Sequence, residues 1–244
     1  MLDRSSNKGI LTLRLSHGKA SAMDLELCET LRTEVESVAQ SDEVKAIVLT
    51  GTGSIFSAGV DLPRMITAGG DYVQRFVNSL DEVLRALFLF PRPVVAAVNG
   101  HAIAGGAIMA FACDYRLMTG GRIGVPELLV GVPFPPLALE IVRFAIPLQH
   151  LQSMIYMGKT IEAEPAKAAG IIDEVVPAEQ LLDRATAVAT QLAAIPAEAF
   201  ALTKRQLREP FVGQRPTRAI RELWDAPTTH NRIREYLAKT IGKK

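Results

Sequence analysis

The spacing of apolar and polar positions predicts strands that alternate with helices over the first half of the chain. Three segments have the pattern of strands: the alternating run Ile10–Leu15 and the apolar runs Val44–Leu49 and Pro93–Val98. Apolar residues at helical spacing predict a helix over Leu25–Ala39, which Asp24 would cap, and a longer helix over Asp71–Phe90. Strands that alternate with helices favour an α/β fold.

From Phe134 onward the pattern is almost entirely helical. The expected helices are Leu137–Phe144, Leu148–Met157, Ala163–Ala169, one from Pro177 to about Ala194, one from Pro196, and the charged stretch Thr217–Ile241. Short strands are expected at Asp114–Met118 and Ile171–Val176. We predict a boundary near Ile195, with a core domain over residues 1–195 and a helical region over residues 196–244.

Composition narrows the classes of partner. The chain has 244 residues, 48% of them hydrophobic and 22% charged, and a net charge of +1, which is typical of a soluble globular protein and argues against nucleic acid as the main partner. The two cysteines and four histidines are scattered, so we predict no metal site. The N-terminus lacks the apolar region of a secretory signal, and Asn99 and His101 interrupt the apolar stretch Pro93–Cys113. We therefore predict a cytoplasmic protein that does not bind a membrane.

The stretch Pro93–Asp114, PVVAAVNGHAIAGGAIMAFACD, carries the first candidate chemistry. It reads as a strand, a turn at Asn99-Gly100, and a helix that starts after Gly105-Gly106. The first backbone N–H groups of a helix are unpaired and suit a negatively charged oxygen. The alternative interpretation is that the glycines only permit close packing of the helix on the strand.

A second loop of the same kind is Phe56–Leu62, FSAGVDL. Ala58 and Gly59 are small, and Asp61 can cap a short helix that follows. Two such loops after two strands are what an oxyanion hole with two donors needs.

Glu127 is the candidate acid/base, because Val125, Pro126, Leu128 and Leu129 surround it with apolar side chains. Burial would raise its pKa toward neutrality, as suits a proton shuttle, although an exposed glutamate at a helix start is an equally common reading. A second carboxylate would be expected beside it. Ile108, one helical turn after Gly105, cannot transfer a proton, and Glu140 falls on the polar face of its helix. One carboxylate is enough to move a double bond, whereas the addition of water is easiest with an acid and a base.

At these residues the sequence resembles the crotonase superfamily, the enoyl-CoA hydratase/isomerase family. The resemblance spans about Ile10 to Val176. Its segments are FSAGVDL at Phe56–Leu62, AAVNGHAIAGG at Ala96–Gly106, ACDYRL at Ala112–Leu117, VPELLVG at Val125–Gly131 and AAGIIDEVVP at Ala168–Pro177.

The resemblance implies a crotonase-like spiral of ββα turns with a C-terminal helical trimerisation region, assembled as a homotrimer or a dimer of trimers. It implies acyl-CoA thioesters of fatty acid metabolism as substrates and no cofactor, since coenzyme A is part of the substrate. The oxyanion donors would be the N–H groups of Val60 and Gly105. The other substrate-binding positions carried over are Lys19, Ala20 and Ala22, which match the loop that contacts coenzyme A, with Ala58, Asp61, Leu62, Gly106 and Ile108.

One departure from the family's pattern selects the expected reaction. Typical hydratases of the family have two glutamates; Glu127 matches the second, and the first falls on Ile108. This pattern resembles the isomerases with one glutamate, which shift a 3-enoyl thioester to the 2-enoyl thioester. The alternatives are a hydratase, another oxyanion-hole reaction such as decarboxylation or hydrolysis, and an acyl-CoA binder without catalysis. The segment VPFPPLALE at Val132–Glu140 also departs from the family and is expected to reshape the acyl pocket.

Several residues outside these motifs are expected to serve only the fold. These are His101 in a loop, Cys113 in the core, Trp224 and Tyr236 between the C-terminal helices, and Lys204, Arg205 and Arg208 on a solvated basic helix face.

Overall fold

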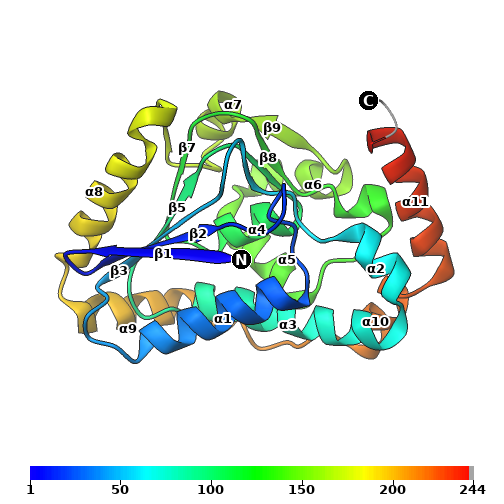
Figure 1. The fold of residues 1–244 in the computed structure, drawn as a ribbon, viewed down its shortest axis with the longest axis horizontal. Coiled ribbons are helices and arrows are strands. Elements are labelled where there is room, and N and C mark those ends of the chain that lie inside the picture. The colour runs from blue at the N-terminus through cyan, green and yellow to red at the C-terminus, as the bar shows by residue number, and fades with distance from the viewer. Residues whose placement is uncertain (242–244) are drawn as a thin grey trace.

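The computed structural model describes residues 1–241, and in that range ten strands form two sheets (Figure 1). The six-stranded sheet has the order β1 (Leu2–Asn7), β2 (Ile10–Leu15), β3 (Ala46–Thr50), β5 (Val94–Val98), β7 (Tyr115–Met118) and β10 (Glu174–Val175). Its strands are parallel except for β1, which is antiparallel to β2. The four-stranded sheet has the order β4 (Ile55–Ser57), β6 (His101–Ile103), β8 (Arg122–Gly124) and β9 (Thr160–Glu162), with β9 antiparallel to β8.

Successive turns of the chain build both sheets together. Strand β3 lies in the large sheet and β4 in the small one, and the helices α2 (Leu62–Ala68) and α3 (Gly70–Phe88) follow. The next turn repeats this with β5, β6 and the helix α4 (Gly105–Phe111), and a third with β7, β8 and the short 3-10 helix η1 (Glu127–Val130). This spiral of two strands and a helix confirms the expected fold class.

The large sheet is buried on both faces. Val94, Ala96 and Val98 of β5 pack in the main core with α1 (Leu25–Ala39), α3 and α4, whereas Val95 and Ala97 pack against α8 (Leu181–Ala193). Figure 1 shows α8 at one flank of the sheet and α1 beside α3 along another. A strand that buries both faces needs apolar residues at every position, which is why Pro93–Val98 shows no alternation.

Two predicted helix caps are confirmed. The Asp24 carboxylate accepts a hydrogen bond of 2.8 Å from the Leu27 N–H and begins α1. The Asp61 carboxylate accepts one of 3.0 Å from the Arg64 N–H and begins α2. The long helix α3 was predicted two residues too far at its C-terminal end and one residue short at its start.

The strand predictions are wrong in three respects. The short strands β4, β6, β8 and β9 were missed, because three residues are too few to show a period. The exposed edge strand β1 was missed because it is mostly polar. The predicted strand Ile171–Val176 reduces to β10, and β6 separates the turn at Asn99-Gly100 from α4, where a direct passage from turn to helix was expected.

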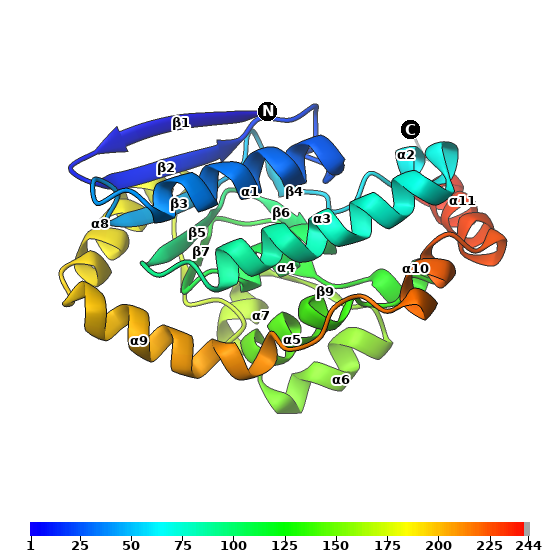
Figure 2. The same ribbon diagram turned by 90° about the horizontal axis from the view of Figure 1, so that it is seen from below.

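The C-terminal half is helical, as predicted. Its helices are α5 (Pro136–Ala145), α6 (Leu148–Tyr156), α7 (Ala163–Ala168), η2 (Ala178–Gln180), α8, α9 (Ala197–Arg208), η3 (Glu209–Phe211), α10 (Arg218–Trp224) and α11 (Pro227–Ile241). Figure 2 shows α9 crossing below the sheet and α10 and α11 beside α2 at the opposite end. The helix α10 contacts α3, and α11 contacts α2 and η1. The division at Ile195 stays a prediction.

No single helix within residues 1–241 has the length and apolar composition needed to cross a membrane. The segments Ala178–Ala193 and Ala197–Phe211 meet that test only as a pair, and the pair is bent by 100°. In the same part of the chain, no group of three or more His, Cys, Asp or Glu side chains is placed to hold a metal ion.

Candidate active site

A cavity lies where the spiral meets the C-terminal helices. Its walls come from the loop after β4, the start of α4, η1, the segment before α5, and α10 and α11. The lining residues are Ala58, Val60, Leu62, Leu80, Ile103, Ala104, Gly105, Ile108, Pro126, Glu127, Val130, Val132, Phe134, Pro135, Ala138, Trp224 and Tyr236. The lining is mostly apolar, as is usual for sites that bind small organic ligands.

The two glycine loops meet at the rim of this cavity. Gly59 has φ +82°, and a Cβ there would lie 2.6 Å from the Ile103 oxygen and 3.1 Å from the Gly105 nitrogen. Only glycine combines this backbone conformation with so close an approach. The loops after β4 and β6 therefore lie side by side, as an oxyanion hole with one donor from each loop requires.

The Val60 N–H is oriented by Met23. The Met23 N–H donates to the Gly59 oxygen at 2.7 Å, and the Asp61 N–H donates to the Met23 oxygen at 3.0 Å. In a parallel bridge of this kind, the residue between the two bonds turns its own N–H away from the partner strand. Among the described residues the Val60 N–H donates no hydrogen bond.

The Gly105 N–H is the first amide of α4. Ala104, which precedes it, has φ +52°, an unusual conformation for a residue with a side chain, and its own N–H donates to the Gly124 oxygen at 2.9 Å. Because Gly105 is the first residue of α4, no preceding helical turn brings a carbonyl to its N–H, and within residues 1–241 this N–H donates no hydrogen bond. Met23 packs behind it, with its sulfur 2.9 Å from the position that a Cβ on Gly105 would take.

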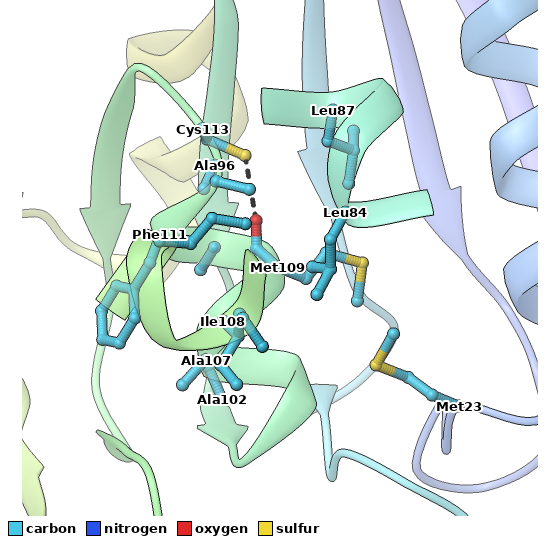
Figure 3. Close-up of a cluster of buried hydrophobic side chains, with 14 of the residues drawn as sticks. Met23, Leu84, Leu87, Ala96, Ala102, Ala107, Ile108, Met109, Phe111 and Cys113 are labelled. Carbon is cyan, nitrogen blue, oxygen red and sulfur yellow. Dashed lines mark hydrogen bonds between the residues drawn. The ribbon is translucent and has the colours of Figure 1, made fainter. Parts of the chain in front are cut away.

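The core side of α4 is apolar throughout. Figure 3 shows Ile108 and Met109 on this helix, with Leu84 of α3 and Met23 on one side of it. Cys113 donates its S–H to the Met109 oxygen at 3.4 Å, and burial raises the pKa of this thiol to about 12. Cys113 is therefore a core residue, as predicted, and not a nucleophile.

Glu127 begins η1 and lines the cavity. Its side chain is 7% exposed, and neither carboxylate oxygen has a hydrogen-bond partner in the described part of the chain. Burial in apolar surroundings raises its pKa to about 8, which confirms the buried reading over the exposed one. A carboxyl group with this pKa can both take and return a proton near neutral pH.

A second carboxylate does not accompany Glu127. Of the described residues that line the cavity, Glu127 alone is an acid. Ile108 lines the wall on α4, and Glu140 lies outside, paired with Arg143 at 2.9 Å. Among the described residues, the arrangement offers one carboxyl group and two backbone N–H groups that donate no hydrogen bond.

The other predicted substrate-binding residues divide into two groups. Ala58, Leu62 and Ile108 line the cavity, as do Val60 and Gly105. Lys19, Ala20, Ala22, Asp61 and Gly106 do not. Gly106 packs so closely on Ser57 that a Cβ would lie 2.4 Å from the Ser57 oxygen, and Asp61 caps α2. The loop that contains Lys19, Ala20 and Ala22 runs beside the loop after β4, because the Ala58 N–H donates to the Ala20 oxygen at 3.0 Å.

Two of the residues expected to serve only the fold also line the cavity. Trp224 and Tyr236 were interpreted as packing between the C-terminal helices, yet both face the cavity from α10 and α11. The expectation of a solvated basic face is wrong for Lys204 and Arg208, which are buried against Asp114 at 2.7 and 2.9 Å, and it holds for Arg205. The one sequence signal that could have drawn attention to the position of Trp224 in the cavity wall is that it is the single tryptophan of the chain.

Comparisons with known proteins agree with this geometry. The family model described as enoyl-CoA hydratase/isomerase matches residues 5–236. A putative enoyl-CoA hydratase of Thermus thermophilus is 33% identical over 186 residues, which cover 75% of this chain and 73% of that protein. The human mitochondrial delta3-delta2-enoyl-CoA isomerase has the same fold, with a TM-score of 0.93, 22% identity, and coverage of 100% and 99% of the two chains. An enoyl-CoA isomerase of Mycobacterium tuberculosis has a TM-score of 0.80 at 30% identity, over 92% and 96% of the two chains.

Proposed function

Because the chain belongs to the enoyl-CoA hydratase/isomerase family, we propose that it moves the double bond of a 3-enoyl-CoA to give the 2-enoyl-CoA. The observation that carries this proposal is that Glu127 is the one acid among the described residues lining the cavity, with Ile108 where a second acid would stand. The names of related structures do not decide between isomerisation and hydration, because the same M. tuberculosis protein is called an isomerase in one structure and a probable hydratase in another.

In this mechanism the thioester oxygen accepts hydrogen bonds from the Val60 and Gly105 N–H groups. Glu127, in its ionised form, removes a proton from C2, and the electron pair of that C–H bond is delocalised over the dienolate and its oxygen. The protonated Glu127 then returns the proton to C4, and the double bond stands between C2 and C3. Two donors at a developing oxyanion stabilise the intermediate in surroundings from which water is largely excluded.

The remaining parts of the proposal concern binding. The coenzyme A portion would follow Ala58, Asp61 and Leu62, and Lys19, Ala20 and Ala22 would contact its adenine and phosphates. Coenzyme A enters as part of the substrate, and the mechanism uses no further cofactor. A cytoplasmic location and a role in fatty acid metabolism remain predictions.

Hydration of a 2-enoyl-CoA is the second candidate. The name of the T. thermophilus relative, which is 33% identical, favours it. Glu127 alone would then have to activate the water and also protonate the other carbon, which is less favourable than sharing these steps between two carboxylates. Another oxyanion-hole reaction and acyl-CoA binding without catalysis remain as further alternatives.

The test is an assay of the purified protein with 3-hexenoyl-CoA and with crotonyl-CoA, alongside Glu127→Gln. We expect isomerisation of the first, no hydration of the second, and loss of the activity in the variant. Glu140→Gln is the matched control, since Glu140 lies outside the cavity and is paired with Arg143. Brisk hydration of crotonyl-CoA would overturn the isomerase proposal, and binding of both thioesters without turnover would favour the binder.

We also propose a homotrimer or a dimer of trimers. Leu148, Tyr156 and Met157, on and just after α6, are 82%, 67% and 64% exposed, and Leu129 of η1 lies against the end of this helix. Exposed apolar side chains gathered in this way mark contact surfaces. Light scattering coupled to size-exclusion chromatography would give the mass, and Met157→Glu with Tyr156→Lys should shift it to the monomer if this surface is the interface.

A further inference from the structure

The cavity changes character from its rim to its inner end. At the rim, Ala58 is exposed and Ile103 and Ala104 are half-buried. Six further lining residues are buried, come from several elements and are here called the inner end: Leu80, Val130, Val132, Phe134, Ala138 and Trp224. All of their cavity-facing groups are apolar apart from the indole N–H, so a hydrocarbon fits this end better than any polar group.

Trp224 is the largest side chain at the inner end, and it is fixed from two sides. Its ring lies 6.1 Å from that of Phe76 on α3, and its Nε1–H donates to the Pro133 oxygen at 2.8 Å. The side chain is only 2% exposed. A ring held by packing on one side and a hydrogen bond on another cannot turn aside without losing both.

The segment that accepts this hydrogen bond is itself restricted. Pro133, Pro135 and Pro136 limit the backbone torsions between Val132 and α5. The Thr229 hydroxyl of α11 donates a hydrogen bond of 3.4 Å to the oxygen of Gly131, which directly precedes this segment. The same hydroxyl lies 2.7 Å from the Leu223 oxygen of α10. The inner end is therefore a rigid wall built by α10, α11 and the proline segment together.

We propose that Trp224 is the residue that ends the acyl site and sets the longest hydrocarbon tail that the enzyme accepts. This inference rests on the proposed acyl-CoA substrate. The reacting carbons lie near Glu127 and the two N–H donors, and the tail extends inward until its terminal carbons meet the indole. The substrate class is thus an acyl-CoA thioester with a purely apolar tail of limited length.

Binding can be followed at Trp224 itself, because it is the only tryptophan in the chain. We would titrate the full-length protein with coenzyme A, acetyl-CoA, hexanoyl-CoA and dodecanoyl-CoA, and measure tryptophan emission and calorimetric binding together. We expect unchanged emission with coenzyme A and acetyl-CoA, and a shift that appears as the tail becomes longer.

Unchanged emission with every acyl-CoA that binds by calorimetry would overturn this inference and leave the proposed function standing. If none of the acyl-CoA thioesters binds, the proposed function itself is overturned, and the inference with it. The two failures are therefore distinguishable.

The kinetic test compares 3-dodecenoyl-CoA with 3-hexenoyl-CoA. In Trp224→Ala the ratio of their kcat/KM values should rise by about tenfold or more, since one methylene gained or lost in a hydrophobic pocket changes kcat/KM by about 10- to 200-fold. Trp224→Phe keeps a ring and should leave the ratio nearer that of the unmodified protein. Leu223→Ala is the matched control, because Leu223 lies on the same helix with its side chain exposed.

A third variant tests the wall without removing a large side chain. Ala138 of α5 lines the inner end, and Ala138→Val should lower the same ratio by making that end shorter. A ratio that stays constant in both Trp224→Ala and Ala138→Val, with Trp224→Ala folded, overturns the proposal. If Trp224→Ala does not fold, a constant ratio in Ala138→Val together with unchanged emission overturns the proposal.

Discussion

Two carboxylates near α4, both largely withdrawn from solvent, have opposite surroundings. Asp114, just beyond the C-terminal end of the helix, accepts hydrogen bonds from the Val94 N–H and the Lys204 ammonium, both at 2.7 Å, and pairs with Arg208 at 2.9 Å. Glu127, which lines the cavity at the N-terminal end, has no partner among the described residues. Each group is suited to a different task.

The cations around Asp114 help to hold distant parts of the fold together. Arg208 also donates to the Phe88 and Ala112 oxygens at 2.8 and 2.9 Å and so caps the ends of α3 and α4. Burial lowers the pKa of Lys204 to about 8, although the adjacent Asp114 acts in the opposite direction. A buried group held by several partners stabilises one arrangement of the chain, whereas a buried group without partners is free to exchange a proton.

The largest expected effect is the loss of catalysis in Glu127→Gln. We expect kcat to fall by about 10²- to 10⁴-fold, the usual contribution of a general acid/base, while the protein remains folded. Steady-state kinetics and thermal unfolding of the same preparation measure both quantities. A lower melting temperature in Glu127→Gln would contradict the contrast between Glu127 and Asp114, because it would mean that Glu127 has a stabilising partner.

Asp114→Asn should show the reverse. Removing one member of a buried ionic cluster leaves Lys204 and Arg208 without their counter-charge and costs about 3–5 kcal/mol of unfolding free energy. The kcat of the fraction that remains folded at low temperature should be close to that of the unmodified protein. Glu222→Gln, in an exposed pair with Arg218, is the control and should change stability by less than about 1 kcal/mol. Equal losses of stability in the two variants would contradict the structural role of Asp114.

The dependence of kcat/KM and of stability on pH should also reveal the unpaired state of Glu127. Since the pKa of Glu127 is about 8 in the folded protein, kcat/KM for the removal of the C2 proton should rise with pH through an apparent pKa near 8. The stabilisation linked to this raised pKa is fully present below about 4.5, the ordinary pKa of a glutamate carboxyl group, and is lost as pH rises through about 8.

Glu127→Gln removes that linkage. Its stability relative to the unmodified protein should therefore increase between pH 4.5 and about 8 and level off above. Denaturant unfolding at a series of pH values measures the difference, and a constant difference over that range would contradict the assignment of the raised pKa to Glu127.

The smallest expected effect comes from replacing glycines by alanine. Comparing Gly59 with Gly53 separates the cost of backbone strain from the effect of a displaced cavity rim. Gly59 and Gly53 both have positive φ, +82° and +62°, so an alanine at either costs about 1–2 kcal/mol. Around Gly53 a Cβ meets nothing within 4 Å, whereas at Gly59 it would press on Ile103 and Gly105. We expect Gly59→Ala to lower kcat on the order of 10-fold or more by displacing the N–H donors, and Gly53→Ala to leave it unchanged. Equal kcat values in the two variants would mean that the rim does not position the substrate.

Local pattern alone was enough for the features whose causes lie within a few residues. The helix Leu25–Ala39 and its Asp24 cap, the Asp61 cap, and the strands over Ile10–Leu15 and Val94–Val98 follow from periodicity and side-chain chemistry at short range. The apolar neighbours of Glu127 in the sequence suggested its burial but did not decide it, because an exposed glutamate at a helix start was an equally common interpretation.

Only the tertiary structure decided which distant groups share a site. Met23 turns the Val60 N–H away from itself across 37 residues of chain, and Trp224 and Tyr236 reach the cavity from helices nearly 100 residues after Glu127. Lys204 and Arg208 look like a solvated face in the sequence and become buried because Asp114 lies opposite them in the fold. These contacts depend on how the sheet and helices pack, and no short-range pattern of residues records them.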